Sequence, residues 1–205
     1  MYHVINGHIG IILEQIPRSH VTEYDYLQKH LKNLDDKEYQ RRFKVFLRLN
    51  AARLSELFCG HYFNILKDVS SKKTNITDVC KRLHEVKTHK HRQSLQFSFA
   101  SKLIHMTDTS MPIYDSMIAD FYFYAEPNRN KSLKDRIHDL ATFHEFLTKE
   151  YNRIINNGLL RDAIRAFRDE LKPQMFTDHK IIDSLIWAFV SFQKKDVAKG
   201  KITYC

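Results

Sequence analysis

The amino-acid sequence predicts an all-α protein, a compact bundle of seven or eight helices. Apolar side chains recur at helical spacing along most of the chain. The 205 residues include only 5 glycines and 4 prolines, which argues against a loop-rich β-sandwich or a disordered chain. A chain of this length can bury a full hydrophobic core. We therefore expect a single domain over residues 1–205, either undivided or made of two packed lobes with a basic lobe at about residues 35–92.

The first residues of the chain give two different signals. The dipeptide Asn6-Gly7 is typical of a tight β-turn, so residues 2–12 predict a short N-terminal β-hairpin. From Glu23 onwards the apolar pattern becomes helical. The first helix that this pattern predicts has an apolar face made of Tyr24, Leu27 and Leu31.

The clearest helical signal covers about residues 36–67. Asp35, Asp36 and Glu38 near its start suit the positive N-terminal end of a helix dipole. Its apolar residues recur at helical spacing and are Tyr39, Phe43, Phe46, Leu47, Leu54, Leu57, Phe58, Tyr62 and Ile65. The sequence therefore predicts one long amphipathic helix in this region.

The rest of the chain predicts further helices separated by short polar loops. Ser132 is a typical N-cap, and Asn157-Gly158 is a typical helix end. Thr177 or Asp178 is the expected cap of the last helix. We expect these helices at about residues 77–86, 95–105, 113–124, 132–156, 159–171 and from 178 onwards.

Positive charge is concentrated in one part of the chain. Residues 37–92 contain 14 Lys/Arg and 5 Asp/Glu, which gives +9, whereas the remaining residues contain 19 of each. Such a concentration favours a polyanion partner, because each neutralised phosphate releases counterions. We expect nucleic acid; the alternatives are a solvated basic face and anionic lipid. The predicted contacts are a stripe on the 36–67 helix and a basic loop, namely Lys37, Arg41, Lys44, Arg48, Lys87, His89, Lys90, His91 and Arg92.

The most informative stretch is residues 97–120, which read FSFASKLIHMTDTSMPIYDSMIAD. It resembles the core signature of the helix-hairpin-helix DNA glycosylases, the superfamily of endonuclease III and 8-oxoguanine glycosylase. In that family a Gly-x-Gly-x-Lys hairpin opens a helix, and a loop containing proline leads to an aspartate at the next helix start. Here Lys102 and Asp115 stand at the lysine and aspartate positions. Ser98 and Ala100 stand where the family has its glycines, and the Lys–Asp separation is several residues shorter.

The resemblance implies a divergent DNA glycosylase of small bacterial or phage-defence type. Such an enzyme hydrolyses the N-glycosidic bond of a damaged or modified base flipped out of duplex DNA, and leaves an abasic site. The process is base-excision repair or defence against phage. The resemblance gives Asp115 the carboxylate that stabilises the oxocarbenium-like sugar and orients or deprotonates the attacking water.

The resemblance also assigns roles to the hairpin residues. Lys102 would be an amine that attacks C1′ and leads to strand cleavage. Ser98 and Ala100 would let backbone N–H groups approach a DNA phosphate closely. Because both glycines are absent, hydrolysis through Asp115 is favoured over a lyase step through Lys102.

A flipped base also requires a pocket with aromatic surfaces on which it can stack. The sequence contains 10 tyrosines and 14 phenylalanines, and four aromatic residues stand together at positions 121–124. Most of these aromatic residues are expected in the core. The candidates for the base pocket lie close to the predicted catalytic residues along the chain, and they are Tyr114, His105, Tyr122 and Tyr124.

Other chemistries find little support in the sequence. Three cysteines cannot ligate a four-cysteine iron–sulfur cluster, and the sequence has no HExxH or paired CxxC motif. It also has no Walker A or Rossmann glycine pattern. Glu85-Val86-Lys87 matches half of a restriction-nuclease motif but ends a predicted helix, and Arg136 and His144 are too far apart for a HEPN-type ribonuclease. We therefore expect neither a metal nor another cofactor.

The sequence favours a cytoplasmic location and leaves the class of function open. No stretch resembles a signal peptide, and none reaches the roughly 18 apolar residues of a membrane span. The low cysteine content fits a reducing compartment. We expect a monomer. The alternatives to a glycosylase are a non-catalytic DNA-binding module on the same scaffold and a helical protein–protein adaptor.

Overall fold

The computed structural model describes residues 1–50, 54–72, 74–88 and 93–198, and this part of the chain is all-α. None of the described residues forms a strand. The described helices are α1 (Tyr2–Gly7), α2 (Ile9–Leu13), α3 (Arg18–Lys29), α4 (Lys37–Phe46), α5 (Glu56–Ser71), α6 (Ile76–His84), α7 (Phe97–Thr107), α8 (Ser116–Phe121), α9 (Leu133–Asn156), α10 (Arg161–Leu171) and α11 (Asp178–Ala198). Among them, none is long and apolar enough to cross a membrane.

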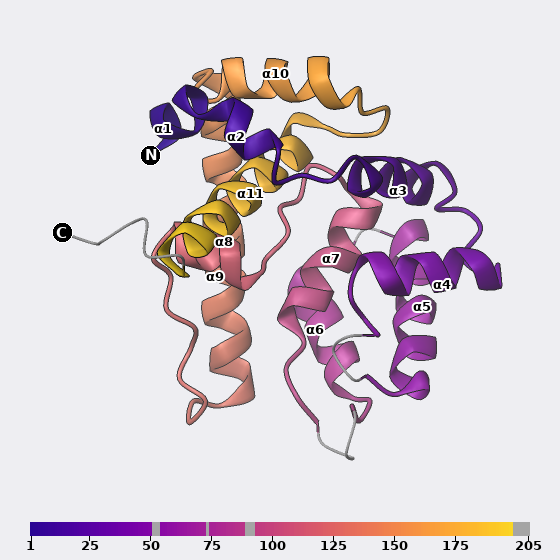
Figure 1. Cartoon of the computed structure of the whole chain (residues 1–205). Helices are drawn as coiled ribbons and strands as arrows, with labels where there is room; N and C mark the ends of the chain where they lie inside the picture. Colours follow the sequence, from indigo (N-terminus) through magenta and orange to yellow (C-terminus); the bar gives the residue numbers. More distant parts are fainter. Residues whose placement is uncertain (51–53, 73, 89–92, 199–205) are drawn as a thin grey trace.

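The helices form two groups that lie side by side (Figure 1). Helices α3 to α7 make up one group, which we call the middle lobe, and α1, α2 and α8 to α11 make up the other, the terminal lobe. The segment of residues 108–115 leads from α7 to α8 and therefore crosses from one lobe to the other. Residues on this segment can meet side chains from both lobes.

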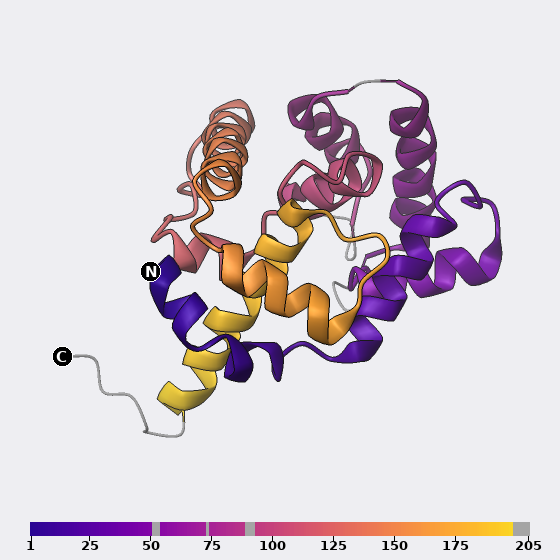
Figure 2. The same ribbon diagram turned by 90° about the horizontal axis from the view of Figure 1, so that it is seen from above.

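Helix α11 is the centre of the terminal lobe. It packs against α1, α2, α8, α9 and α10, and Figure 2 shows the orange helix α10 crossing it. Five of its apolar side chains are fully buried, namely Ile181, Ile182, Leu185, Ile186 and Ala188. Because successive residues of α11 face neighbours on several sides, the helix is buried around most of its circumference.

The middle lobe has an aromatic core at the junction of α4 and α5. Phe43 of α4 is fully buried, and its ring centroid lies 5.3 Å from that of Phe63 and 5.9 Å from that of Tyr62. Helices α5, α6 and α7 pack against one another, and α3 packs against α4. This packing holds the C-terminal end of α4 close to α7.

The predicted caps of the C-terminal helices are confirmed. The Asp135 N–H donates to the side chain of Ser132 (3.1 Å), so Ser132 caps α9. The Lys180 N–H donates to the hydroxyl of Thr177 (3.3 Å) at the start of α11. Gly158 has a φ of +62°, which is the left-handed conformation expected after a helix end.

The single long helix predicted for residues 36–67 is wrong. α4 ends at Phe46 and α5 begins at Glu56. The Leu49 N–H donates back to the Lys44 carbonyl (2.9 Å), and Arg48 between them has a φ of +60°. This is a helix end with a left-handed residue. Both helices turn their apolar faces to the same core, so the apolar spacing continues across the break.

The predicted N-terminal β-hairpin is also wrong, because residues 2–13 form α1 and α2. The side chain of Asn6 does not make a turn. Its amide donates to the Leu159 carbonyl (2.9 Å), and its carbonyl oxygen accepts the Ala163 N–H (3.1 Å). Asn6 therefore joins α1 to the start of α10. The neighbouring side chain of Ile5 is fully buried and also anchors α1 in the hydrophobic core.

We expect Asn6→Ala to lower the free energy of unfolding by about 2 kcal/mol, because two hydrogen bonds are lost and partly buried backbone groups lose their partner. His8→Ala is the matched control. His8 is exposed and its ring contacts only the carbonyl of Val4 in its own helix, so we expect a change within about 0.5 kcal/mol. Chemical denaturation measures both, and equal effects would contradict the role of Asn6.

Candidate active site

Lys102 lies on α7 and Asp115 at the end of the 108–115 segment, and a hydrogen bond joins these two parts of the chain. The Tyr114 N–H donates to the hydroxyl of Ser101 (2.9 Å), which is fully buried. Ser101 and Tyr114 immediately precede Lys102 and Asp115, so this bond holds the two segments that carry them side by side. The charge of Asp115 acts on the pKa of Lys102, and that of Lys102 acts on the pKa of Asp115.

Asp115 stands at the N-terminus of α8 and is partly exposed. Its Oδ1 accepts the Ile118 N–H (3.0 Å), so Asp115 caps the helix and its carboxylate is held in one orientation. The helix predicted for residues 113–124 is accordingly shorter, at Ser116–Phe121. Burial raises the pKa of Asp115, and the charge of Asp183 raises it further, against the lowering effects of the Ile118 N–H and Lys102.

Lys102 projects from α7 towards the end of α4. Its Nζ lies 3.4 Å from the carbonyl oxygen of Leu47 and 5.0 Å from the centre of the Phe99 ring. Burial lowers the pKa of Lys102, because the charged ammonium loses water. The cations Lys180 and Arg48 lower it further, whereas Asp115 raises it. Lys102 is thus an amine shifted towards its neutral, nucleophilic form.

The structure adds an ion pair that sequence reasoning missed. Lys180 and Asp183 lie on one turn of α11, 2.9 Å apart, with side chains only 6% and 8% exposed. Asp183 acts on the pKa of both Lys102 and Asp115. The site therefore combines this ion pair with the charges of Lys102 and Asp115, which influence each other's pKa. The signal in the sequence is that Lys180 and Asp183 flank Ile181 and Ile182, which are buried.

An aromatic pair from the middle lobe lies beside these charges. The rings of His20 and Phe46 are 4.7 Å apart and tilted by 30°, and both side chains are partly exposed. Burial lowers the pKa of His20 to about 3, and the charges of Lys180 and Arg48 act in the same direction. His20 is therefore neutral at physiological pH. Together His20 and Phe46 offer flat, uncharged surfaces next to the charged groups.

His105 is not an accessible pocket residue, which corrects the prediction. Its side chain is 1% exposed. Nδ1 lies 2.7 Å from the Met111 carbonyl and Nε2 lies 2.8 Å from the Tyr24 hydroxyl, so Nδ1 carries the proton and Nε2 accepts from Tyr24. Burial lowers the pKa of His105 to about 3. His105 joins α7 to α3 and to the 108–115 segment.

The three tyrosines predicted for the base pocket pack around Phe143 of α9 instead. Tyr114 is 4% exposed and meets Phe143 edge to face, with ring centroids 6.0 Å apart. Tyr124 stacks on the same ring at 3.8 Å. The Tyr122 hydroxyl lies 3.2 Å from that of Tyr2, on the side of α1. Their rings complete the terminal lobe, and none of these contacts faces Lys102.

The predicted basic stripe lies partly on α4. Lys37 and Arg41 are exposed and Lys44 is partly exposed, but Arg41 forms an ion pair with Glu38 (2.6 Å). Arg48 lies beyond the helix end, so the stripe is not continuous as predicted. Because Arg48 is exposed and its charge acts on the pKa of Lys102, the end of the stripe nonetheless reaches the site.

Ser98 and Ala100 lie in the first turn of α7; Ser98 is partly exposed, so its phosphate contact stays a prediction, whereas the predicted contact of Ala100 is wrong. Ala100 is fully buried, so its backbone cannot approach a phosphate. Lys87 is exposed and its carbonyl accepts the Ser55 hydroxyl (3.2 Å). The other predicted loop contacts, His89, Lys90, His91 and Arg92, lie outside the described residues.

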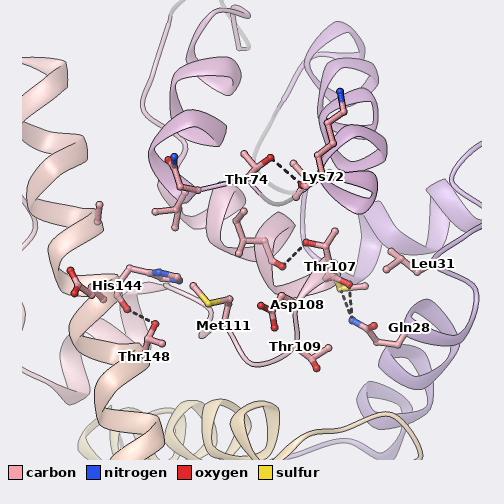
Figure 3. A pocket seen from close by; sticks show the side chains of 17 residues that line it. Gln28, Leu31, Lys72, Thr74, Thr107, Asp108, Thr109, Met111, His144 and Thr148 are labelled. Carbon is pink, nitrogen blue, oxygen red and sulfur yellow. Dashed lines mark hydrogen bonds between the residues drawn. The ribbon is translucent and has the colours of Figure 1, made fainter.

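A pocket of about 800 Å³ lies beside α7 (Figure 3). Ile104, Met106 and Thr107 of α7 line it. Figure 3 shows His144 and Thr148 on the α9 side and Gln28 on the α3 side. None of the predicted site residues lines this pocket, so it is separate from the charged site.

Comparisons of the chain with protein-family models, with curated proteins and with solved structures found no match. Within the described part of the chain, no group of three His, Cys, Asp or Glu side chains is arranged to hold a metal ion.

Proposed function

We propose that the chain is a DNA N-glycosylase that acts on a base flipped out of the duplex. The observation that carries this proposal is the convergence of Lys102 and Asp115 between the two lobes, each partly exposed and each with a pKa shifted by burial. Ligand sites commonly lie between lobes, and shifted pKa values mark groups suited to acid–base or nucleophilic work.

Asp115 has the chemistry that cleavage of an N-glycosidic bond requires. The departing base leaves positive charge on C1′ and O4′ of the sugar. A fixed carboxylate in a partly water-free site stabilises that charge, and because its orientation is set by the Ile118 N–H it needs little reorganisation. Asp115 acts as the ionised form, so activity is expected above its raised pKa and is lost as the pH falls through it.

Lys102 supplies a nucleophile in the same site. Its amine attacks C1′, the glycosidic bond breaks, and the base leaves with the bonding electrons and gains a proton. Loss of a proton from nitrogen and opening of the C1′–O4′ bond give an imine. Removal of a C2′ proton then expels the 3′ phosphate, and water releases the lysine. Burial lowers the pKa of Lys102, which increases the fraction of neutral amine available for this attack.

Duplex DNA fits the charge around the site. Arg48 is exposed, and its charge acts on Lys102. The basic residues Lys37, Arg41 and Lys44 lie on α4, which ends just before Arg48. Binding of DNA phosphates to this surface would release counterions from the DNA. These contacts would also fix the position of the duplex on the protein. The flat rings of His20 and Phe46 provide stacking surfaces for an extruded base.

We propose Phe123 as the side chain that fills the gap that an extruded base leaves. Its side chain is 86% exposed, and its φ of +53° is unusual for a bulky residue. The Tyr124 N–H donates to the Ala119 carbonyl (2.9 Å), so Phe123 occupies the helix-end position after α8 that glycine prefers. Phe123 thus exposes an apolar ring to solvent from a strained backbone conformation. Such a ring is suited to insertion between bases.

We expect Phe123→Gly to raise the free energy of unfolding by up to about 1 kcal/mol, because the strain is relieved and no packing is lost. Base release from duplex DNA falls about tenfold, whereas release from single strands is unchanged. The matched control is Lys172→Gly, which relieves the same strain after α10 (φ +47°) without removing a ring and leaves both substrates unaffected. Loss of stability in Phe123→Gly would assign the ring a packing role.

The direct test of the function is an assay for abasic sites. Purified protein is incubated with duplexes carrying damaged or modified bases, and the products are treated with alkali. Alkali-labile sites that depend on the protein support a glycosylase. Salt-dependent DNA binding without such sites would support the non-catalytic DNA-binding module instead, and absence of salt-dependent binding would leave the protein–protein adaptor.

A further inference from the structure

The pocket beside α7 has no role in the chemistry described so far. Its volume of about 800 Å³ lies within the range of roughly 300–1,000 Å³ in which small-molecule sites are found. Helices α3, α5, α6 and α7 of the middle lobe and α9 of the terminal lobe form its walls, together with part of the 108–115 segment. Apolar side chains cover much of the lining, among them Leu31, Val69, Ile76, Ile104 and Met106. The pocket can therefore remove an apolar body from water.

His144 on α9 presents an unused hydrogen-bond acceptor to this pocket. Its side chain is 2% exposed, and Figure 3 shows its ring directed from α9 into the pocket. Nε2 lies 2.8 Å from the carbonyl oxygen of Pro112, which can only accept, so Nε2 carries a proton. Burial lowers the pKa of His144, so the ring is neutral at physiological pH and Nδ1 is an acceptor. Nδ1 has no hydrogen-bond partner in the described part of the chain, although buried polar groups normally have one.

Other polar groups of the lining also offer acceptors. Thr107 donates its O–H to the Ile104 carbonyl (2.9 Å), and Thr148 donates its own to the His144 carbonyl (2.9 Å), as the dashed lines in Figure 3 show. Because a hydroxyl has a single proton, both oxygens are left to accept a hydrogen bond from a ligand. Gln28 donates through Nε2, whereas its Oε1 has no partner among the described residues. The lining therefore favours a ligand group that donates hydrogen bonds.

The charged groups of the lining favour a cation. The carboxylates of Asp108 and Glu145 both line the pocket. One oxygen of Asp108 accepts the Ser110 N–H (3.0 Å) and one oxygen of Glu145 pairs with Lys149 (2.8 Å), and within the described residues the second oxygen of each carboxylate has no partner. Lys72 is the cation among the described lining residues, and Figure 3 shows its ammonium group directed away from the pocket.

We propose that the pocket is a binding site for a small primary amine with an apolar body. The protonated amino group has three N–H donors and no acceptor, so it donates to Nδ1 of His144, and the carboxylates of Asp108 and Glu145 attract its charge. The hydrocarbon or aromatic part of the ligand lies against the apolar lining. An anion at the same place meets acceptors and negative charge and is rejected. The inference does not rest on the proposed glycosylase function, because none of the residues assigned to that function lines the pocket.

Two matched pairs of probes, titrated calorimetrically into the full-length protein, test the proposal. Tryptamine is compared with indole-3-propionate, and hexylamine with heptanoate, so that each pair shares an apolar body and differs in the charged end. We expect at least one amine to bind at least about tenfold more tightly than its carboxylate. The net charge of +9 attracts anions to the rest of the surface, so a preference for the amine reports the pocket. A smaller preference in both pairs, or no binding of either amine at about 10 mM, overturns the proposal.

His144→Gln tests whether the amine binds in this pocket. Glutamine can still donate an N–H to the Pro112 carbonyl but has no acceptor at the position of Nδ1, so the affinity for the tighter-binding amine is expected to fall at least about tenfold. His138→Gln is the matched control, because His138 is exposed on the same helix and does not line the pocket, and it is expected to stay within about twofold of the wild type. Equal affinities in the two variants would overturn the proposed site.

Asp108→Asn decides the question where His144→Gln fails to fold. Asparagine can still accept the Ser110 N–H, so the substitution removes the negative charge and keeps the local hydrogen bond. The affinity for the amine is expected to fall about threefold, whereas that for the matched carboxylate does not fall. Asp169→Asn, at an exposed position of α10 outside the pocket, is the control and is expected to leave both affinities unchanged. An amine affinity as high in Asp108→Asn as in Asp169→Asn contradicts the proposal.

Discussion

Asp115→Asn is expected to reduce the formation of abasic sites by about 1,000-fold or more, while binding to duplex DNA is retained. The reduction follows from the loss of the negative charge that stabilises the sugar cation, since single electrostatic or acid–base groups contribute factors of about 100 to 10,000. Asparagine caps helices as well as aspartate does, so its carbonyl oxygen can still accept the Ile118 N–H at the start of α8. The fold is therefore preserved and the charge alone is removed.

The matched control is Asp120→Asn. Asp120 lies on the same helix, is exposed and pairs with Lys194 at the surface, so its substitution is expected to leave base release within about twofold of the wild type. Activity is followed as alkali-labile sites under single-turnover conditions, and binding is followed at several salt concentrations. An Asp115→Asn protein with full activity would remove Asp115 from the site and with it the proposed chemistry.

Elements set by local capping are those that the sequence predicts well. Ser132 and Thr177 cap α9 and α11 where expected, because an N-cap bond is made within three residues of the cap. The break after α4 was not predictable from apolar spacing, because Leu47 and Leu49 are buried although neither lies in a helix. The spacing of apolar residues indicates which side chains are buried. It does not indicate whether one continuous helix connects them.

Long-range contacts decided the elements that the sequence predicted incorrectly. Asn6 bonds to a carbonyl 153 positions further along the chain, and that bond favours a helix over the turn that Asn6-Gly7 predicts locally. His105 was expected beside a substrate, yet its partner Tyr24 is 81 positions away and no local pattern indicates the pair. Tertiary contacts of this kind override local propensity.

Of the four residues in the charged site, the sequence predicted Lys102 and Asp115 but not Lys180 and Asp183. Lys102 and Asp115 were found through a motif, and the bond between Ser101 and Tyr114 holds the two segments that carry them side by side. Lys180 and Asp183 stand three positions apart, which is the usual spacing of an exposed helical ion pair, so the sequence alone does not separate a surface pair from a buried one. Only the packing around α11 shows that this pair is buried.

Lys102→Gln is expected to abolish the covalent protein–DNA complex that borohydride traps from the wild-type enzyme. Borohydride reduces the carbon–nitrogen double bond of the imine to a stable amine, so the complex reports the bond between Nζ and C1′. Glutamine has no nucleophilic amine, and its length preserves much of the packing over Phe99. Strand cleavage without alkali is expected to disappear with the complex, since the imine is what makes the C2′ proton acidic.

Lys149→Gln is the matched control, because Lys149 is exposed on α9 and pairs only with Glu145. It is expected to trap as the wild type does. The trapped yield is also expected to fall in Asp115→Asn, since the same sugar cation precedes attack by the amine. Base release by the wild type with no trapped complex would overturn the role of Lys102. Hydrolysis assisted by Asp115 would then be the whole reaction, and the lowered pKa of Lys102 would reflect burial alone.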